Sequence, residues 1–66
     1  MKQVHSSHIE AIGYEDGNLV VQYKSGKVAV HAGVPEDIAN QVINSGSVGT
    51  ALHLLVKGTY PHEYKS

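Results

Sequence analysis

The sequence contains no cysteine, tryptophan or phenylalanine, and only two prolines. Without cysteine, disulfides cannot staple the fold and a thiolate zinc site is excluded. The absence of cysteine also fits a cytoplasmic protein, which is the location we expect. No apolar run is long enough to span a bilayer, and the first residues lack the apolar stretch of a signal peptide.

Excess charge of one sign is also lacking, because five basic and six acidic residues give a formal net charge of −1 with histidine neutral. The broad basic footprint of nucleic-acid binders is therefore missing, although a local basic stripe is compatible with this balance. A chain of 66 residues is one domain, and a core this small favours self-association. We expect a single domain over 1–66 with flexible ends at 1–5 and 61–66.

The first half of the chain alternates apolar and polar residues, which predicts strands over 9–14, 19–24 and 27–31. Glu15-Asp16-Gly17-Asn18 and Ser25-Gly26 are turn sequences, with Gly17 and Asn18 suited to positive φ. The three strands therefore form an antiparallel meander.

The alternation also assigns faces to the side chains. Leu19, Val21 and Tyr23 share one face of the second strand. The face rich in large apolar groups is expected to pack on helices and to include Val28 and Val30. The other face is expected to carry Val20, Ala29 and His31 among polar groups.

The second half of the chain has helical spacing. Pro35 suits a helix start, Ile38, Ala39, Val42 and Ile43 form a stripe, and Gly46 is the expected C-cap. Ser47 is the expected N-cap of a second helix that ends at Gly58. The predicted fold is α+β: a three-stranded antiparallel β-meander followed by two short α-helices packed on one face.

Four short motifs, spread over the chain from Val4 to Tyr60, indicate a family resemblance. They are Val4-x-Ser6-Ser7-x-Ile9-x-Ala11-Ile12-Gly13-Tyr14, Leu19-x-Val21-x-Tyr23-x-x-Gly26, Gly33-Val34-Pro35 and Ser47-x-Gly49. In these motifs the chain resembles the KTSC family, named for the C-terminal extension of some lysyl-tRNA synthetases and also found free-standing in bacteria and phages. The resemblance implies a small β-meander with helices and an RNA-binding role.

The chain departs from that family at two places. The family tends to carry Tyr-x-Tyr in the third strand, where this chain has Ala29-Val30-His31. It also tends to carry an aromatic pair in the second helix, where this chain has Ala51-Leu52-His53. A ligand that stacks on those aromatics would have lost its platform here.

Ser45-Gly46-Ser47-Val48-Gly49-Thr50 is the strongest candidate for a binding site. A small glycine-containing loop that enters a helix presents backbone N–H groups to a phosphate, and the hydroxyls of Ser47 and Thr50 add donors. The Gly-Lys-Ser/Thr of an ATP-hydrolysing loop is missing. The alternative interpretation is an ordinary capped joint between two helices.

The other clusters of polar or aromatic residues are weaker candidates for a functional site. His5-x-x-His8 offers too few ligands for a metal, and Ser6, Ser7 and His8 lack the orienting group of a catalytic triad. The four tyrosines could stack on bases, with Tyr60 and Tyr64 the freest to do so. Lys24, Lys27 and His31 form a local basic patch, or else a solvated edge.

Together these features predict a non-enzymatic, homo-oligomeric module that holds a small nucleotide-type phosphate ligand. In a phage setting, such a module is expected to sequester a nucleotide signal. The expected ligand-binding residues are Ser47, Gly49, Thr50, His53, His31 and Lys24. We expect no catalytic residue, metal or cofactor. The alternatives are a sequence-tolerant RNA-binding domain and a protein-interaction adaptor.

Overall fold

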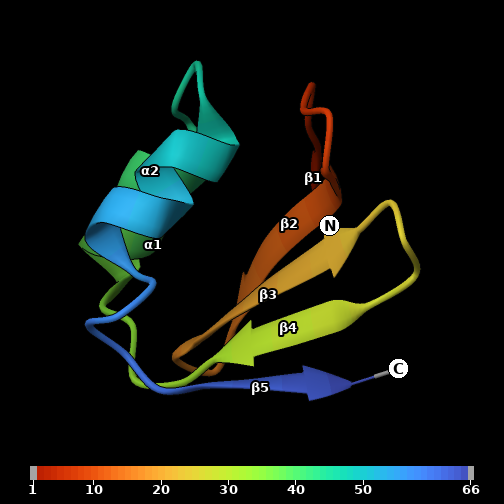
Figure 1. The fold of residues 1–66 in the computed structure, drawn as a ribbon. Coiled ribbons are helices and arrows are strands. Elements are labelled where there is room, and N and C mark those ends of the chain that lie inside the picture. The colour runs from red at the N-terminus through yellow and green to blue at the C-terminus, as the bar shows by residue number, and fades with distance from the viewer. Residues whose placement is uncertain (1, 66) are drawn as a thin grey trace.

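The computed structural model describes residues 2–65 (Figure 1). In chain order its elements are β1 (Lys2–Gln3), β2 (Ile9–Glu15), β3 (Asn18–Tyr23), β4 (Val28–His31), α1 (Glu36–Ile43), α2 (Val48–Leu55) and β5 (His62–Lys65). The five strands form one antiparallel sheet in the order β1-β2-β3-β4-β5. None of the helices in this part of the chain is long and apolar enough to cross a membrane.

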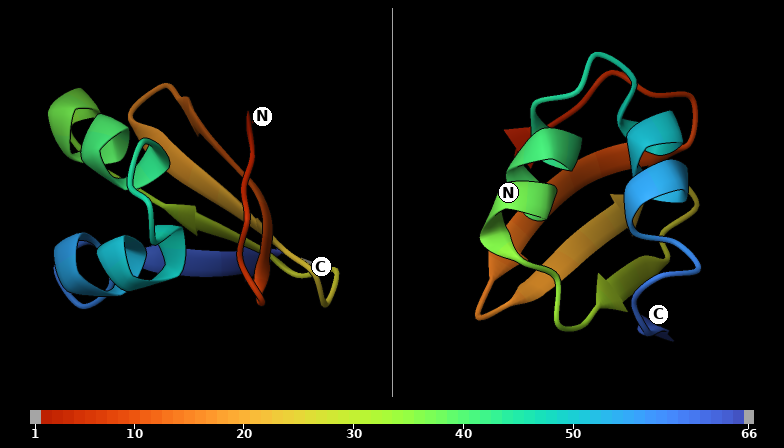
Figure 2. Two further views of the ribbon diagram at one scale, coloured as in Figure 1. Left: turned by 90° about the horizontal axis from the view of Figure 1, so that it is seen from above. Right: turned by 90° about the vertical axis from the view of Figure 1, so that its left-hand side faces the viewer.

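Both helices lie on the same face of the twisted sheet, as the views in Figure 2 show. The α+β class and the placement of the helices are therefore as predicted. The core between the two layers is made of aliphatic side chains: Ile9, Ile12, Leu19, Val21, Ala29, Val34, Ala39, Val42, Val48, Leu52 and Val56. Tyr14 closes one end of it, because its hydroxyl donates a hydrogen bond to the carbonyl of Val34 at the entry to α1.

The prediction of three strands is wrong, because the sheet has five. The two additional strands, β1 and β5, lie in segments that we expected to be flexible ends. Lys2 and Gln3 pair with Ile12 and Ala11, and β5 pairs along the whole of β4. Both strands are exposed, so they lack the buried apolar alternation by which strands are predicted.

The faces predicted for the side chains of the third expected strand, which is β4 in the structure, are also wrong. Val21 pairs with Ala29 and Leu19 with His31, so Ala29 and His31 point into the core beneath the helices. The Lys24–Gly26 connection fixes this register, since Gly26 donates to the Tyr23 carbonyl and Tyr23 donates to Lys27.

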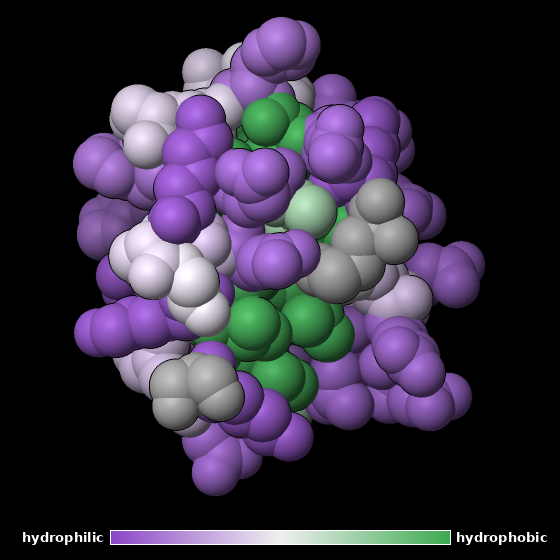
Figure 3. Space-filling view, turned by 90° about the vertical axis from the view of Figure 1, so that its right-hand side faces the viewer, coloured by the Kyte–Doolittle hydropathy of each residue, from purple (hydrophilic) through white to green (hydrophobic). Residues whose placement is uncertain are grey.

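The opposite, helix-free face of the sheet therefore carries half-buried Val28 and Val30 beside Val20. Figure 3 looks at the molecule from the side away from the helices and shows hydrophobic side chains gathered within a hydrophilic surround. The composition of Val28–His31 could not reveal this, because valine, alanine and valine offer no contrast between the two faces.

Two local details differ from the sequence-based expectations. The residues with positive φ in the first turn are Asp16 and Gly17, at 52° and 79°, rather than Gly17 and Asn18. This is the backbone of a two-residue hairpin turn with matching twist. The C-cap of α1 is Asn44 rather than Gly46, because the Asn44 backbone and side chain both donate to the Asn40 carbonyl.

Candidate functional site

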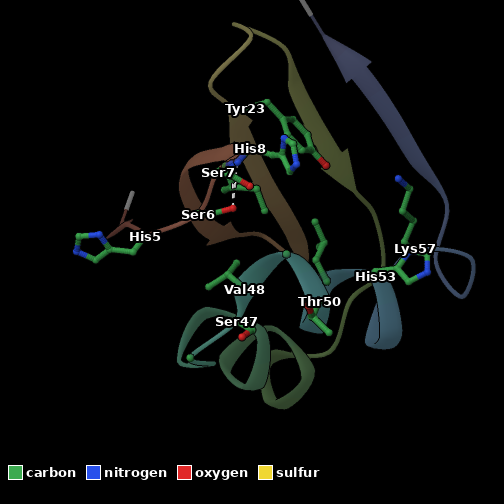
Figure 4. A pocket seen from close by; sticks show the side chains of 14 residues that line it. His5, Ser6, Ser7, His8, Tyr23, Ser47, Val48, Thr50, His53 and Lys57 are labelled. Carbon is green, nitrogen blue, oxygen red and sulfur yellow. Dashed lines mark hydrogen bonds between the residues drawn. The ribbon is translucent and has the colours of Figure 1, made fainter.

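A cavity of about 560 Å³ lies between the segment before β2 and the start of α2 (Figure 4). One wall is His5–His8, the other is Gly46–Thr50 with His53 and Lys57, and Ile9, Tyr23 and Leu52 complete the lining. The walls are some forty residues apart in the sequence. They face each other because α2 packs over the end of the sheet where β2 begins.

Ser6 shapes the first wall of the cavity. Its Oγ accepts hydrogen bonds from the backbone N–H groups of His8 and Ile9, at 3.2 and 3.3 Å. This is the turn that serine forms with its own following backbone. A bulge follows within β2, where the register shifts between Ile9 and Ala11. The turn and the bulge together hold the serines against α2.

The N-terminus of α2 forms the second wall. Ser47 is the N-cap, but its side chain makes no capping hydrogen bond. Ala51 makes the first helical bond, from its N–H to the Ser47 carbonyl. The N–H groups of Val48, Gly49 and Thr50 have no acceptor among residues 2–65. They are the unsatisfied donors of a helix start, which carries a partial positive charge.

Gly49, which has no side chain, leaves space open between the two walls. A methyl group at its Cα would lie 3.9 Å from Ser6 Oγ, an ordinary van der Waals contact. A side chain at this position would therefore fit, but it would occupy space within the cavity.

The polar side chains around the cavity are basic or hydroxylated. His8, His53 and Lys57 lie on it with the hydroxyls of Ser7, Ser47 and Thr50, and none of its described lining residues is a carboxylate. Burial raises the pKa of the Tyr23 phenol, with Tyr64 adding to the shift, so Tyr23 stays a neutral donor. Such a lining can bind an anionic ligand that also carries an apolar group.

Four of the six predicted ligand-binding residues line this cavity: Ser47, Gly49, Thr50 and His53. Lys24 and His31 do not. Lys24 is exposed in the β3–β4 turn and reaches the first wall only through its backbone, which donates to the His8 carbonyl at 2.8 Å.

His31 is a core residue with 1% of its surface exposed. Neither ring nitrogen has a hydrogen-bond partner among the described residues. Its ring packs 5.2 Å from that of His62 on β5. Burial lowers the pKa of His31, and the nearby His62 and Lys57 lower it further, so the imidazole is neutral in the folded protein.

Sequence reasoning missed the first wall and the far end of the cavity, namely Ser6, Ser7, His8, Tyr23 and Lys57. One signal could have found the serines. Two of the motifs on which the family resemblance rests, Ser6-Ser7 and Ser47-x-Gly49, end up on opposite walls of one cavity. Their meeting depends on tertiary packing, which spacing along the chain does not reveal.

The pairs considered for metal binding and catalysis do not assemble. His5 projects away from the other labelled side chains in Figure 4, so it does not join His8. No group of three metal-ligating side chains occurs within residues 2–65. The Ser6 hydroxyl oxygen is engaged by its own turn, as described above.

An antiparallel sheet with two helices on one face and a cavity at the start of the second helix define a small α+β domain. Its sequence matches the KTSC domain family over residues 5–60, and the chain belongs to that family. A crystal structure of a KTSC domain protein from Yersinia pestis is similar to it. That structure has 27% sequence identity and a TM-score of 0.89 over 98% of this chain and 94% of the other. No curated protein matches the chain.

Proposed function

We propose that this domain is a non-enzymatic, homo-oligomeric cytoplasmic module that holds a small nucleotide-type phosphate ligand in the cavity at the start of α2. One observation carries the proposal: Val48, Gly49 and Thr50, whose N–H groups lack an acceptor within residues 2–65, line a cavity that has no carboxylate among its described lining residues. Backbone donors at a helix N-terminus are a common phosphate site. Lys57 adds positive charge, and the ring of His53 adds a further hydrogen-bonding group.

The rest of the cavity suits the remainder of such a ligand. Its volume of about 560 Å³ is in the range of small-molecule sites. Tyr23, Ile9 and Leu52 supply apolar surface for a base or sugar, and Tyr23 adds a hydroxyl donor. Because none of the described lining residues is a carboxylate that could pair with a histidine, we expect the ligand to be held rather than converted. A protein of this kind sequesters a nucleotide, for example a nucleotide signal in a phage-infected cell.

The first test removes the hydroxyl donors. The Ser47→Ala/Thr50→Ala protein should bind nucleoside 5′-monophosphates about tenfold more weakly than wild type, the effect of losing roughly 1.4 kcal/mol of hydrogen bonding. Amide NMR shifts of residues 48–50 report the binding. Ser25→Ala/Thr59→Ala is the matched control, because these two residues lie outside the cavity. Equal binding by all three proteins would place the ligand elsewhere.

The second test reduces the space in the cavity without removing a hydrogen-bond donor. Gly49→Ala adds a methyl group between α2 and Ser6 while leaving every backbone N–H in place. Alanine is the better helix former by up to about 1 kcal/mol, so the variant should be at least as stable as wild type. Its binding of the same nucleotides should nevertheless be weaker. A stable variant with unchanged affinity would contradict the site.

The same titrations separate the other two functions. A sequence-tolerant RNA-binding domain would bind single-stranded RNA with an affinity that falls steeply with salt, and would ignore mononucleotides. A protein adaptor would leave the amide shifts unchanged with both ligands. A nucleotide holder makes few phosphate contacts and should respond weakly to salt.

A further inference from the structure

The free edge of β5 is a self-complementary surface. β5 is the last strand of the sheet, and within residues 2–65 nothing pairs with its outer side. All four of its residues are exposed. An unpaired edge strand presents a row of backbone donors and acceptors to another strand. The opposite edge, β1, has only two residues and offers far less.

The pairing of β5 with β4 determines which backbone groups face outward. The Ala32 N–H donates to the Pro61 carbonyl at 2.9 Å. In an antiparallel pair such bonding alternates, so Glu63 and Lys65 also turn their backbone groups toward β4. His62 and Tyr64 then direct their N–H and C=O groups out of the sheet.

This alternation restricts how two copies of β5 can pair around a two-fold axis. Residues that face each other must both present their backbone groups outward, or both inward. Centring the axis on Glu63 would set two glutamates directly opposite each other, which is unfavourable. Centring it on Tyr64 pairs each Glu63 with Lys65 of the second copy. Of these two registers, charge therefore selects the one centred on Tyr64.

The side chains fit the same register. Glu63 and Lys65 lie opposite Val30 and Val28, so both ion pairs would form on the helix-free face beside half-buried valines. Within residues 2–65, Tyr64 is one of two large apolar side chains left exposed, at 52%. Its ring stands edge-on to His62, with centroids 5.3 Å apart. Pairing would bring the two Tyr64 rings together at the axis.

We propose that two copies of this chain join through antiparallel β5 strands centred on Tyr64, continuing the sheet across a two-fold axis. A two-fold contact of this kind closes on itself and does not extend into a filament. The strands are short, so the dimer is reversible and dissociates on dilution. This inference rests on the homo-oligomeric part of the proposed function and is independent of the ligand in the α2 cavity.

Sedimentation velocity over a range of protein concentrations tests the interface. Wild type should form a dimer that weakens with added salt. Glu63→Lys and Lys65→Glu, each alone, set like charges opposite each other and should raise the dissociation constant about tenfold or more. The exchanged double variant Glu63→Lys/Lys65→Glu restores both pairs and should dimerise to within about threefold of wild type.

Glu15→Lys is the control for Glu63→Lys, because it makes the same change in net charge away from β5 and should leave the dimer intact. A protein that stays monomeric at millimolar concentration would overturn the proposal. So would a dimer indifferent to the single exchanges, or one that the double exchange fails to restore. Nucleotide binding by these variants is measured separately. A result that overturns the β5 dimer therefore leaves the proposed nucleotide site at α2 to be judged by its own titrations.

Discussion

At the scale of single residues, His31 is the least expected feature of the protein. A histidine with 1% exposure and two unpartnered ring nitrogens forgoes hydrogen bonds that water would supply to the unfolded chain. Its core position follows from the pairing of β3 and β4, which sets it opposite Leu19. His31 therefore acts on stability rather than at the cavity.

The buried imidazole makes stability depend on pH. Its folded-state pKa is lowered by burial, then by His62 and Lys57, whereas the unfolded chain takes up the proton near pH 6.5. Below that pH the unfolded state binds more protons, so the free energy of unfolding falls as pH falls. The free energy of unfolding measured in urea should be lower at pH 5.5 than at pH 7.5.

His31→Leu is the matching variant, because leucine is close in size and has no nitrogens to satisfy. It should be more stable than wild type by about 1 kcal/mol at neutral pH and should lose much of the dependence on pH. A variant that keeps the full wild-type slope between pH 7.5 and 5.5 would assign the effect to another histidine.

Tyr14 provides a second residue-scale prediction. Its hydroxyl satisfies the carbonyl of Val34, a residue almost wholly buried where the chain enters α1. Tyr14→Phe keeps the ring but leaves that carbonyl without its partner. We expect the free energy of unfolding to drop by about 1 kcal/mol in urea titrations. An unchanged midpoint and slope would mean that water replaces the hydroxyl.

At the scale of elements, the two helices could be predicted from short stretches of sequence. Pro35 and the apolar stripe after it located α1, and Ser47 and Gly58 bracketed α2, because caps and helical spacing are properties of neighbouring residues. β1 and β5 could not be found in this way. His62–Lys65 is exposed throughout and becomes a strand only because β4 offers it an edge.

The first hairpin turn gives an element-scale prediction. Gly17 and Gly46 both have open space where a Cβ would be added, but only Gly17 has a left-handed φ, at +79°. Gly17→Ala should therefore lower the free energy of unfolding by about 1 kcal/mol, whereas Gly46→Ala should change it by less than about 0.5 kcal/mol. Thermal unfolding of the two variants measures the contrast. Equal losses would show that strain is not the cause.

At the scale of the whole molecule, the candidate site depends on contacts between distant parts of the chain. The sequence predicted its α2 wall, because a glycine-containing helix start has a recognisable composition. It could not predict the facing wall, since Ser6 and Ser7 meet α2 only after the sheet and the helices have packed together. It also placed His31 wrongly on the open face of the sheet, because one hairpin connection decides that face.

The proposed function requires the cavity at the start of α2 to hold a small phosphate-bearing nucleotide. Native mass spectrometry of wild-type and Gly49→Ala protein, purified side by side from the same cells, tests it most directly. We predict that wild type carries a retained mass in the nucleotide range and that Gly49→Ala has lost it while remaining folded. Wild-type protein without any added mass, or equal retention by both proteins, would contradict the claim.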